Sequence, residues 1–165
     1  MATYGEVPLG NPVLAQIKAE RAGKYQFRLY PQLWKSSELA DYYAGRKWDS
    51  YPFSDVVPDL PHAPGIYMFV VGPYCGRLKD HSYIFYVGRT NDLKRRYREY
   101  LEEKLGRKPT DRKPIVLLLN DFEGFLYFHC TQIPESECKR AEDLLKDNLT
   151  PFSNTQLELR GRLTL

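Results

Sequence analysis

Two side chains that could do chemistry, a cation (Arg96) and a phenol (Tyr100), lie in one basic stretch, residues 83–104. Arg96 and Tyr100 are four residues apart, so a helix would place them one above the other. Tyr86 precedes them on a run that is typical of a strand. A guanidinium can pair with a phosphate group and can favour the ionised form of a nearby phenol. For this stretch alone, the alternative is a solvated basic helix with aromatic residues in the core.

The elements that must position these side chains follow from the pattern of apolar residues. β-Branched and aromatic residues alternate over residues 83–88, which predicts a strand. Asn91 or Asp92 can then cap a helix by accepting hydrogen bonds from its first free amides. Four residues separate successive members of one apolar helical face: Leu93, Tyr97, Leu101 and Leu105. A strand followed directly by a helix is therefore expected here.

A carboxylate lies toward the inner side of the last predicted helix, which begins near Pro134. Glu142 is four residues after Cys138 and three before Leu145, and both of these neighbours belong to the apolar stripe of that helix. A carboxylate so placed is costly to desolvate without a cation beside it. The residues alone leave two explanations equally open: a salt bridge to Arg96 or another basic residue, and a metal ion.

Two short signatures, GIY at residues 65–67 and YVG at residues 86–88, resemble those that name the GIY-YIG nuclease family. Arg96 lies eight residues after the second signature, where that family keeps its arginine. Downstream, Glu142 matches the family's metal-binding glutamate, and Asn154 follows at the exit from the last helix. Within the family, the chain looks most like the small Type II restriction endonucleases.

The resemblance covers residues 63–155 and implies an α+β fold, a small three-stranded antiparallel sheet flanked by helices. Residues 64–71 and 83–88 are expected to be two of the strands. The alternation over residues 125–133 predicts the third strand. Residues 156–165 are expected to form a C-terminal tail.

Two smaller expectations concern the region after the second predicted strand. Pro114 suits the first turn of a helix, which favours a short helix over residues 114–121. His129 lies within the third predicted strand, so we expect it to be a packed or hydrogen-bonded strand residue and not a metal ligand.

Residues 1–62 lie outside the resemblance and are expected to form an α-rich N-terminal extension. Ser36 or Ser37 can cap a short helix that ends near Gly45. The proline-rich stretch that follows predicts an extended, ordered connection. Because the extension is rich in aromatic residues, we expect it to pack on the core. It serves either as a structural cover or as an arm that contacts DNA.

The resemblance implies phosphodiester hydrolysis assisted by Mg²⁺, with Mn²⁺ as a substitute and Glu142 as the single protein ligand. In that scheme, Tyr67 and Tyr86 position the attacking water and help to deprotonate it. Arg96 pairs with the phosphate and favours an ionised phenol. Several family members have histidine where this chain has Tyr100, whereas the nucleotide-excision-repair branch has tyrosine. The identity of the general base therefore stays open.

Four further residues are expected to contact the substrate: Arg89, Lys94, Arg95 and Asn154. Arg89 directly follows YVG, where relatives keep lysine or arginine, and Asn154 either braces the site or contacts a phosphate. Residues 89–113 contain ten Lys or Arg against five Asp or Glu, a surplus larger than the net charge of +3 of the whole chain. This concentration indicates a face turned toward a polyanion.

Composition indicates the cellular compartment in which the protein is expected to work. The three cysteines contain no CxxC pair, which gives no sign of a zinc site and fits a reducing compartment. The N-terminus has no apolar signal core, and no apolar run is long enough to span a membrane. We therefore expect a cytoplasmic protein.

Taken together, the resemblance predicts a sequence-specific, restriction-type endonuclease that acts on double-stranded DNA. A homodimer or a transient pair is expected, because two strands must be cut, and no protein partner is implied. Two alternatives remain. One is a nicking nuclease of DNA repair or of a mobile element, and the other is a DNA-binding module without turnover.

Overall fold

The computed structural model describes residues 31–72, 82–151 and 154. Its elements, in chain order, are η1 (Leu33–Lys35), α2 (Ser37–Ala44), β1 (Asp49–Pro52), β2 (Gly65–Val71), β3 (Tyr83–Thr90), α3 (Leu93–Lys104), α4 (Lys113–Asp121), β4 (Leu126–Gln132) and α5 (Glu135–Leu149). The first half of the predicted N-terminal extension and the predicted C-terminal tail lie outside the described residues. Within the described part of the chain, no helix is long and apolar enough to cross a membrane.

The four strands form one antiparallel sheet in the order β1-β4-β2-β3. The α+β class with an antiparallel sheet is confirmed, but the expectation of three strands is wrong. The fourth strand, β1, comes from the proline-rich stretch that was expected to be only a connection. Its partner is β4, with Asp49 opposite Cys130 and Pro52 opposite Tyr127. Because β1 is an edge strand, Pro52 costs the sheet little at the strand's end.

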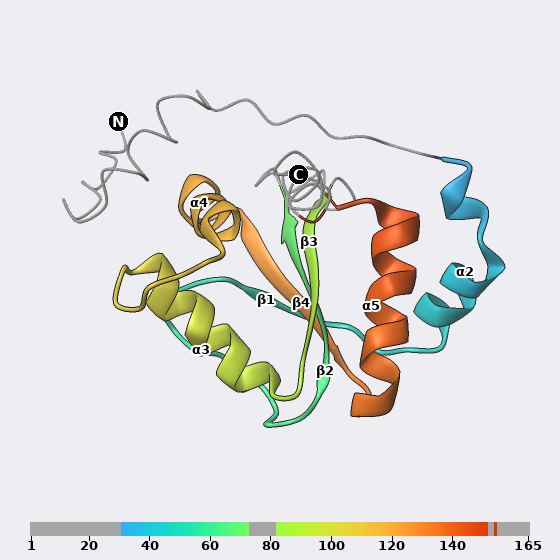
Figure 1. Cartoon of the computed structure of the whole chain (residues 1–165), viewed down its shortest axis with the longest axis horizontal. Coiled ribbons are helices and arrows are strands. Elements are labelled where there is room, and N and C mark those ends of the chain that lie inside the picture. Colours follow the sequence, from blue (N-terminus) through green and yellow to red (C-terminus); the bar gives the residue numbers. More distant parts are fainter. Residues whose placement is uncertain (1–30, 73–81, 152–153, 155–165) are drawn as a thin grey trace, which may run out of the picture.

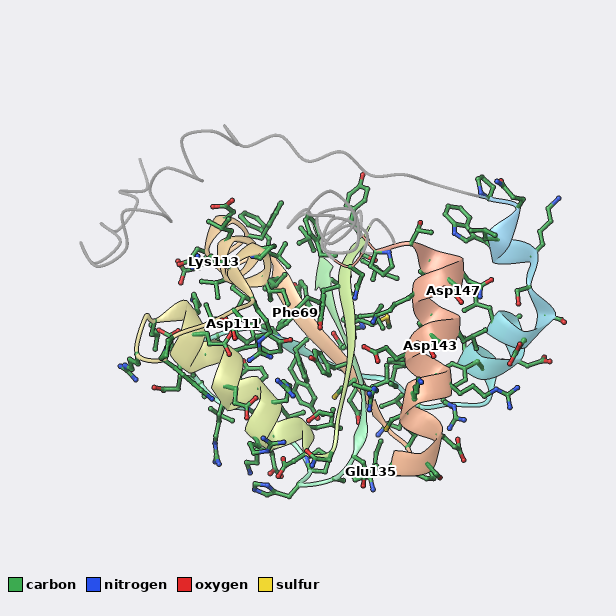
Figure 2. The ribbon with its side chains drawn as sticks, viewed as in Figure 1. Phe69, Asp111, Lys113, Glu135, Asp143 and Asp147 are labelled. Atoms are coloured by element: carbon green, nitrogen blue, oxygen red, sulfur yellow. The ribbon has the colours of Figure 1, made fainter. Side chains whose placement is uncertain are left out.

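Helices cover both faces of the sheet, and this explains why β2 is buried along its whole length. Figure 1 shows α3 and α4 on one side of the sheet and α5 and α2 on the other. On the first side, Tyr67 and Phe69 of β2 pack with apolar residues of α3 and α4. On the second side, Ile66 and Met68 pack with apolar residues of α5 and α2. Figure 2 shows side chains, among them Phe69, filling the space between the sheet and the helices.

Local sequence signals place the helix starts. The Oδ1 atom of Asp92 accepts from the backbone N–H of Arg95 at 2.8 Å, so Asp92 is the cap of α3. Ser36 caps α2 by accepting from the N–H of Leu39 at 3.3 Å. Pro114 stands in the first turn of α4, whose apolar residues are buried. These three helices match the sequence predictions.

Candidate active site

Two of the predicted site tyrosines form a buried hydrogen-bonded pair. The hydroxyl oxygens of Tyr67, on β2, and Tyr100, on α3, are 2.8 Å apart, and both side chains are almost fully buried. Aromatic contacts fix the two rings. The ring of Tyr67 stacks on Phe128 with centroids 5.2 Å apart, and the ring of Tyr100 meets Phe69 edge-on at 5.0 Å. The phenols are therefore held rigidly between the sheet and α3.

Burial shapes the acidity of these phenols. Desolvation raises the pKa of Tyr67 well above its ordinary value, and the nearby Arg96 cation offsets only part of this rise. Desolvation also raises the pKa of Tyr100, with Arg112 and Arg96 acting in the opposite direction. Both phenols thus carry their protons at neutral pH. The pair is suited to hold and orient a hydrogen-bonding partner more than to supply a free phenolate.

The glycines of the two signatures have a steric role. A Cβ atom at Gly88 would lie 2.5 Å from the hydroxyl oxygen of Tyr67 and 2.8 Å from the ring of Tyr86. A Cβ atom at Gly65 would lie 2.4 Å from the carbonyl oxygen of Thr131. Glycine at position 88 therefore lets the Tyr67 ring lie across β3, beside the ring of Tyr86, whose centroid is 6.1 Å away.

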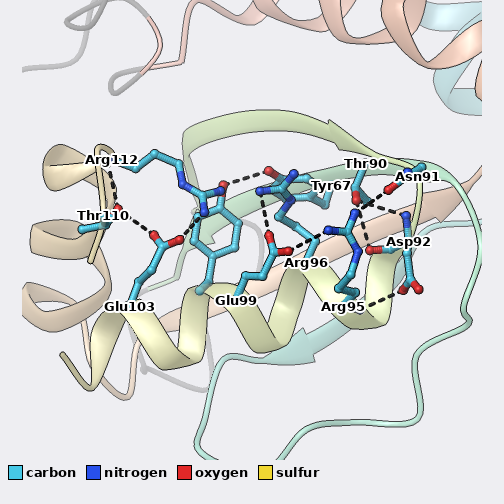
Figure 3. Close-up of polar contacts among 11 residues, drawn as sticks. Tyr67, Thr90, Asn91, Asp92, Arg95, Arg96, Glu99, Glu103, Thr110 and Arg112 are labelled. Atoms are coloured by element: carbon cyan, nitrogen blue, oxygen red, sulfur yellow. Dashed lines mark hydrogen bonds and ion pairs between the residues drawn. The ribbon is translucent and has the colours of Figure 1, made fainter. Parts of the chain in front are cut away.

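Arg96 lies beside the tyrosine pair, as its spacing from Tyr100 predicts. Its Nη1 atom is 3.0 Å from a carboxylate oxygen of Glu99, and its side chain is 23% exposed (Figure 3). The Nε–H group of Arg96 is buried and has no hydrogen-bond partner. A buried donor without a partner is unusual in a folded protein. An acceptor that reached this donor would satisfy it.

The predicted metal-binding carboxylate lies on the opposite face of the sheet. Glu142 of α5 is 14% exposed and has a cation on each oxygen, with Oε2 2.9 Å from Arg89 Nε and Oε1 3.0 Å from Lys146 Nζ. Arg89 is opposite Ile66 in the β2–β3 register, and Ile66 packs on the α5 side. Of the two sequence explanations for Glu142, the structure contains a salt bridge, and its partners are Arg89 and Lys146 rather than Arg96.

The two groups of residues meet at the edge strand β3, which α3 and α5 flank (Figure 1). Gly88 touches Tyr67 and Tyr86 on one face, and the next residue, Arg89, pairs with Glu142 on the other. The two signature tyrosines and Glu142 are thus arranged around two successive positions of one strand, Gly88 and Arg89.

The donor set suits a largely hydrated divalent ion. Among the described residues, no group of three or more His, Cys, Asp or Glu side chains could enclose a metal. A divalent ion at Glu142 would therefore have one acidic protein ligand and would keep its remaining coordination for water and substrate oxygens. Mg²⁺ binds in this way because it is dehydrated reluctantly. One of the two cations at Glu142 would have to give up its carboxylate oxygen.

The predicted substrate contacts differ in their accessibility. Arg89 and Arg95 are about half exposed, and Arg95 pairs with Glu99 at 2.8 Å. Lys94 is less exposed, and its Nζ atom is 3.6 Å from Asp59. Asn154 is buried, and its amide makes two hydrogen bonds to the backbone of Val87: Oδ1 accepts from the N–H at 2.8 Å, and Nδ2 donates to the carbonyl at 2.9 Å. This geometry favours the bracing role over the phosphate contact.

Sequence reasoning missed one residue next to the tyrosines. The guanidinium of Arg112 lies 4.7 Å from the ring centroid of Tyr100, in the turn before α4. Its carboxylate partner is Glu103 of α3 (Figure 3). Nothing in the spacing indicates this, because twelve residues separate Arg112 from Tyr100 and the intervening turn is simply hydrophilic.

Comparison with known proteins gives a likeness only among solved structures. No protein-family model matches the chain, and no curated protein matches it. Crystal structures of point mutants of the GIY-YIG N-terminal endonuclease domain of UvrC from Thermotoga maritima, bound to a catalytic divalent cation, do match. Two of them have 18% sequence identity, cover 59% of this chain and 88% of theirs, and have a TM-score of 0.41. A third has a TM-score of 0.40 at the same identity.

Proposed function

We propose that the protein is a metal-dependent endonuclease that hydrolyses phosphodiester bonds in DNA. The observation that carries this proposal is the clustering around Gly88 and Arg89. Gly88 is in contact with Tyr67 and Tyr86, and Arg89 is paired with Glu142. The residues that resemble the GIY-YIG signatures are widely separated in sequence, yet they gather at one strand edge.

Each side chain has a role that follows from its surroundings. Arg96, with its unpaired buried Nε–H, binds the phosphate whose ester bond breaks. Tyr67 and Tyr100, both protonated, form a fixed hydrogen-bonding unit. Tyr86 is the more exposed phenol and is the one that meets the attacking water. Glu142 holds the divalent ion, which when bound relieves charge on the phosphoryl oxygens and makes water more acidic.

The test is cleavage of supercoiled plasmid DNA by the purified protein with Mg²⁺, with Mn²⁺ and with a chelator. We expect nicked or linear product only with a metal ion. Replacing Glu142 by Gln or Arg96 by Met should lower the rate about a hundredfold or more, since each removes stabilisation of charge in the transition state. The matched control is Asp143→Asn, which changes the neighbouring carboxylate on the exposed side of α5 (Figure 2). Undiminished cleavage by both site variants would refute the assignment.

The hydroxyl of Tyr67 can be tested separately. Tyr67→Phe keeps the ring and its stacking on Phe128 but removes the 2.8 Å hydrogen bond to Tyr100. We expect a large loss of rate, about a hundredfold, with the protein still folded. Comparison of the pH–rate profiles of the two proteins measures the role: identical rates and profiles would show that the hydroxyl takes no part.

At a finer level, we propose that cleavage is sequence-specific and restriction-type, by two copies that each cut one strand. An extension that adds a strand of its own to the sheet supports this proposal. A discrete set of fragments from long DNA is expected, with the new ends sharing one sequence. Random nicks would instead indicate a nicking nuclease of DNA repair or of a mobile element.

A second candidate function is DNA binding without turnover. The observation that favours it is the neutralisation of Glu142 by Arg89 and Lys146, which leaves the carboxylate satisfied in the absence of any metal. This alternative predicts salt-dependent DNA binding and no metal-dependent product. Isothermal titration with Mn²⁺ separates the two: metal binding that is lost in Glu142→Gln supports the nuclease.

A further inference from the structure

A buried charged pair lies behind the tyrosines, outside the site described above. Glu103 of α3 is almost completely buried, and its carboxylate pairs with Arg112. The second carboxylate oxygen accepts from the hydroxyl of Thr110 at 2.8 Å, and that hydroxyl accepts from the backbone N–H of Arg112 at 2.9 Å. Figure 3 shows this network beside α3. A buried carboxylate this well satisfied holds its partner in one orientation.

The partner it holds faces Tyr100. The guanidinium carbon of Arg112 is 4.7 Å from the ring centroid of Tyr100, within the range of a cation–π contact. The same ring carries the hydroxyl that is bonded to Tyr67 at 2.8 Å. A continuous series of contacts therefore runs from Glu103 through Arg112 and Tyr100 to Tyr67.

We propose that Arg112, held by the buried Glu103, is a positioning residue that fixes the ring of Tyr100 and thereby the hydroxyl of Tyr67 at the active site. The inference rests on the proposed nuclease function for its catalytic consequence, but not for its structural part. Arg112 touches no substrate in this arrangement and acts only through Tyr100.

The charges around Tyr100 support the assignment. The ionisable groups that face it are Tyr67, Tyr86, Arg96 and Arg112. Burial raises the pKa of the Tyr100 phenol, and Arg112 and Arg96 are the two cations that lower it. Because Arg112 lies against the ring itself, it biases Tyr100 toward being the more acidic member of the pair.

The first test reads Tyr100 without any enzyme assay. Difluorotyrosine incorporated at position 100 alone has a lowered pKa, and its fluorine NMR signal reports ionisation. We expect Arg112→Met to raise that pKa by about one unit, because it removes a cation that favours the ionised phenol. Arg112→Lys, which keeps the charge without the planar face, should give a smaller rise. The control is Arg107→Met, a 65% exposed arginine of the same turn that pairs with Glu102, which should change nothing. An unchanged pKa in Arg112→Met would overturn the proposal.

The second test separates positioning from substrate contact. In plasmid cleavage, Arg112→Met should lower kcat about ten- to a hundredfold and leave KM for DNA unchanged, because a misplaced group costs rate without costing binding. Arg112→Lys should recover part of the loss. A raised KM with unchanged kcat would overturn the proposal by making Arg112 a DNA contact. If the unmodified protein cleaves nothing, the proposed function fails, while the fluorine signal still decides whether Arg112 governs Tyr100.

Folding is controlled by a double variant. Arg112→Met alone leaves the carboxylate of Glu103 buried and unpaired, which destabilises a protein strongly. Glu103→Leu combined with Arg112→Met removes both charges and keeps the volume filled, so this variant should unfold cooperatively like the unmodified chain. It should retain the raised pKa at position 100. A pKa that returns to the unmodified value in the double variant would overturn the proposal.

Discussion

Gly88 sets how closely the two signature tyrosines can approach each other. The Tyr67 ring lies over this position, so any side chain at residue 88 would overlap with the ring and its hydroxyl. The glycine is therefore needed for space, and its conformational freedom is not the reason. The same close approach holds the Tyr67 hydroxyl at the edge of β3, one residue away from Arg89.

Replacing Gly88 by Ala should destabilise the protein by about 2 kcal/mol, because inserting a methyl group into a packed interior forces its neighbours to shift. The added Cβ would lie 2.5 Å from the Tyr67 hydroxyl oxygen. Urea unfolding measures the change. The control is Gly72→Ala, whose Cβ would meet the ring of Tyr127 at an ordinary 3.5 Å and should cost little. Equal stability of the two variants would show that the Tyr67 ring is not fixed by this contact.

His129 gives the protein a predictable response to mild acid. It lies on β4 with its Nε2 atom 3.2 Å from the hydroxyl of Ser50 on β1, which confirms the expectation of a hydrogen-bonded strand residue. Burial lowers its pKa below the ordinary 6.5. The unfolded chain therefore takes up a proton more readily than the folded one, and the stability that His129 contributes above its unfolded pKa is lost as the pH falls below it.

We expect the free energy of unfolding, measured with urea, to be lower at about pH 5.5 than at about pH 7.5, the range in which an ordinary histidine titrates. His129→Gln keeps a polar group near Ser50 but cannot titrate, so it should remove part of this difference. If the variant and the unmodified chain lose the same stability between the two pH values, His129 is not the group responsible.

At the scale of elements, Asn154 joins the end of the chain to the sheet. Its side-chain amide hydrogen-bonds to both the N–H and the carbonyl of Val87, as the backbone of a neighbouring strand would. These groups lie on the open edge of β3, next to Gly88 and Arg89. The segment after α5 therefore braces the strand that carries the candidate site.

Asn154→Ala should destabilise the protein by about 2 kcal/mol or more, because it leaves a buried donor and a buried acceptor without partners. Asn154→Asp should also destabilise it, since the carboxylate can accept from the N–H of Val87 but cannot donate to the carbonyl. Hydrogen exchange at the Val87 amide, measured by NMR, should become faster in both. Asn148→Ala, which removes only a bond to Leu144 within α5, is the control. Unchanged protection of Val87 in the Ala variant would contradict the bracing role.

Much of this element structure was predictable from local signals. Apolar periodicity, the caps Ser36 and Asp92, and Pro114 locate three helices, and alternation locates β3 and β4. The strand β2 was expected from the GIY signature, since all of its residues are buried and none alternate. β1 was not predictable, because four residues ending in proline have no periodicity and become a strand only through pairing with β4. Tertiary contact decided that element.

The site was predictable in its membership but not in its arrangement. Signature spacing identifies Tyr67, Tyr86, Arg96 and Glu142, whose roles stay predictions. It does not indicate that Glu142 lies across the sheet from the tyrosines, since that depends on which face α5 covers. It also does not indicate Arg112, because a turn residue has no pattern that relates it to a ring twelve residues away.

At the scale of the molecule, the N-terminal extension supplies part of the core. β1 pairs with β4, and Phe53 and Leu60 are buried with the residues of β2, α3 and α4. The ring of Phe53 also meets Tyr97 with centroids 4.9 Å apart. Residues 49–62 are thus built into the same sheet and core as residues 63–151.

A fragment that begins at residue 63 should fail to unfold cooperatively, because it loses an edge strand and three buried apolar side chains (Leu39, Phe53 and Leu60), each worth about 2 kcal/mol. A fragment that begins at residue 31 keeps every described element and should unfold in one transition. Circular dichroism during thermal unfolding distinguishes them. A cooperative transition for the shorter fragment would establish residues 63–165 as an independent folding unit.

The two edge strands of the sheet, β1 and β3, are both poorly suited to pairing with a strand of another molecule. On one rim, the amide of Asn154 occupies the backbone groups of Val87, and on the other, β1 is short and ends at Pro52. Proteins use such devices to avoid polymerising into fibrils through exposed strands. Two copies that assemble on a duplex to sever both of its strands are therefore expected to meet through helices or loops, since a continuous intermolecular sheet would first have to displace Asn154 from Val87 or pair with the short β1.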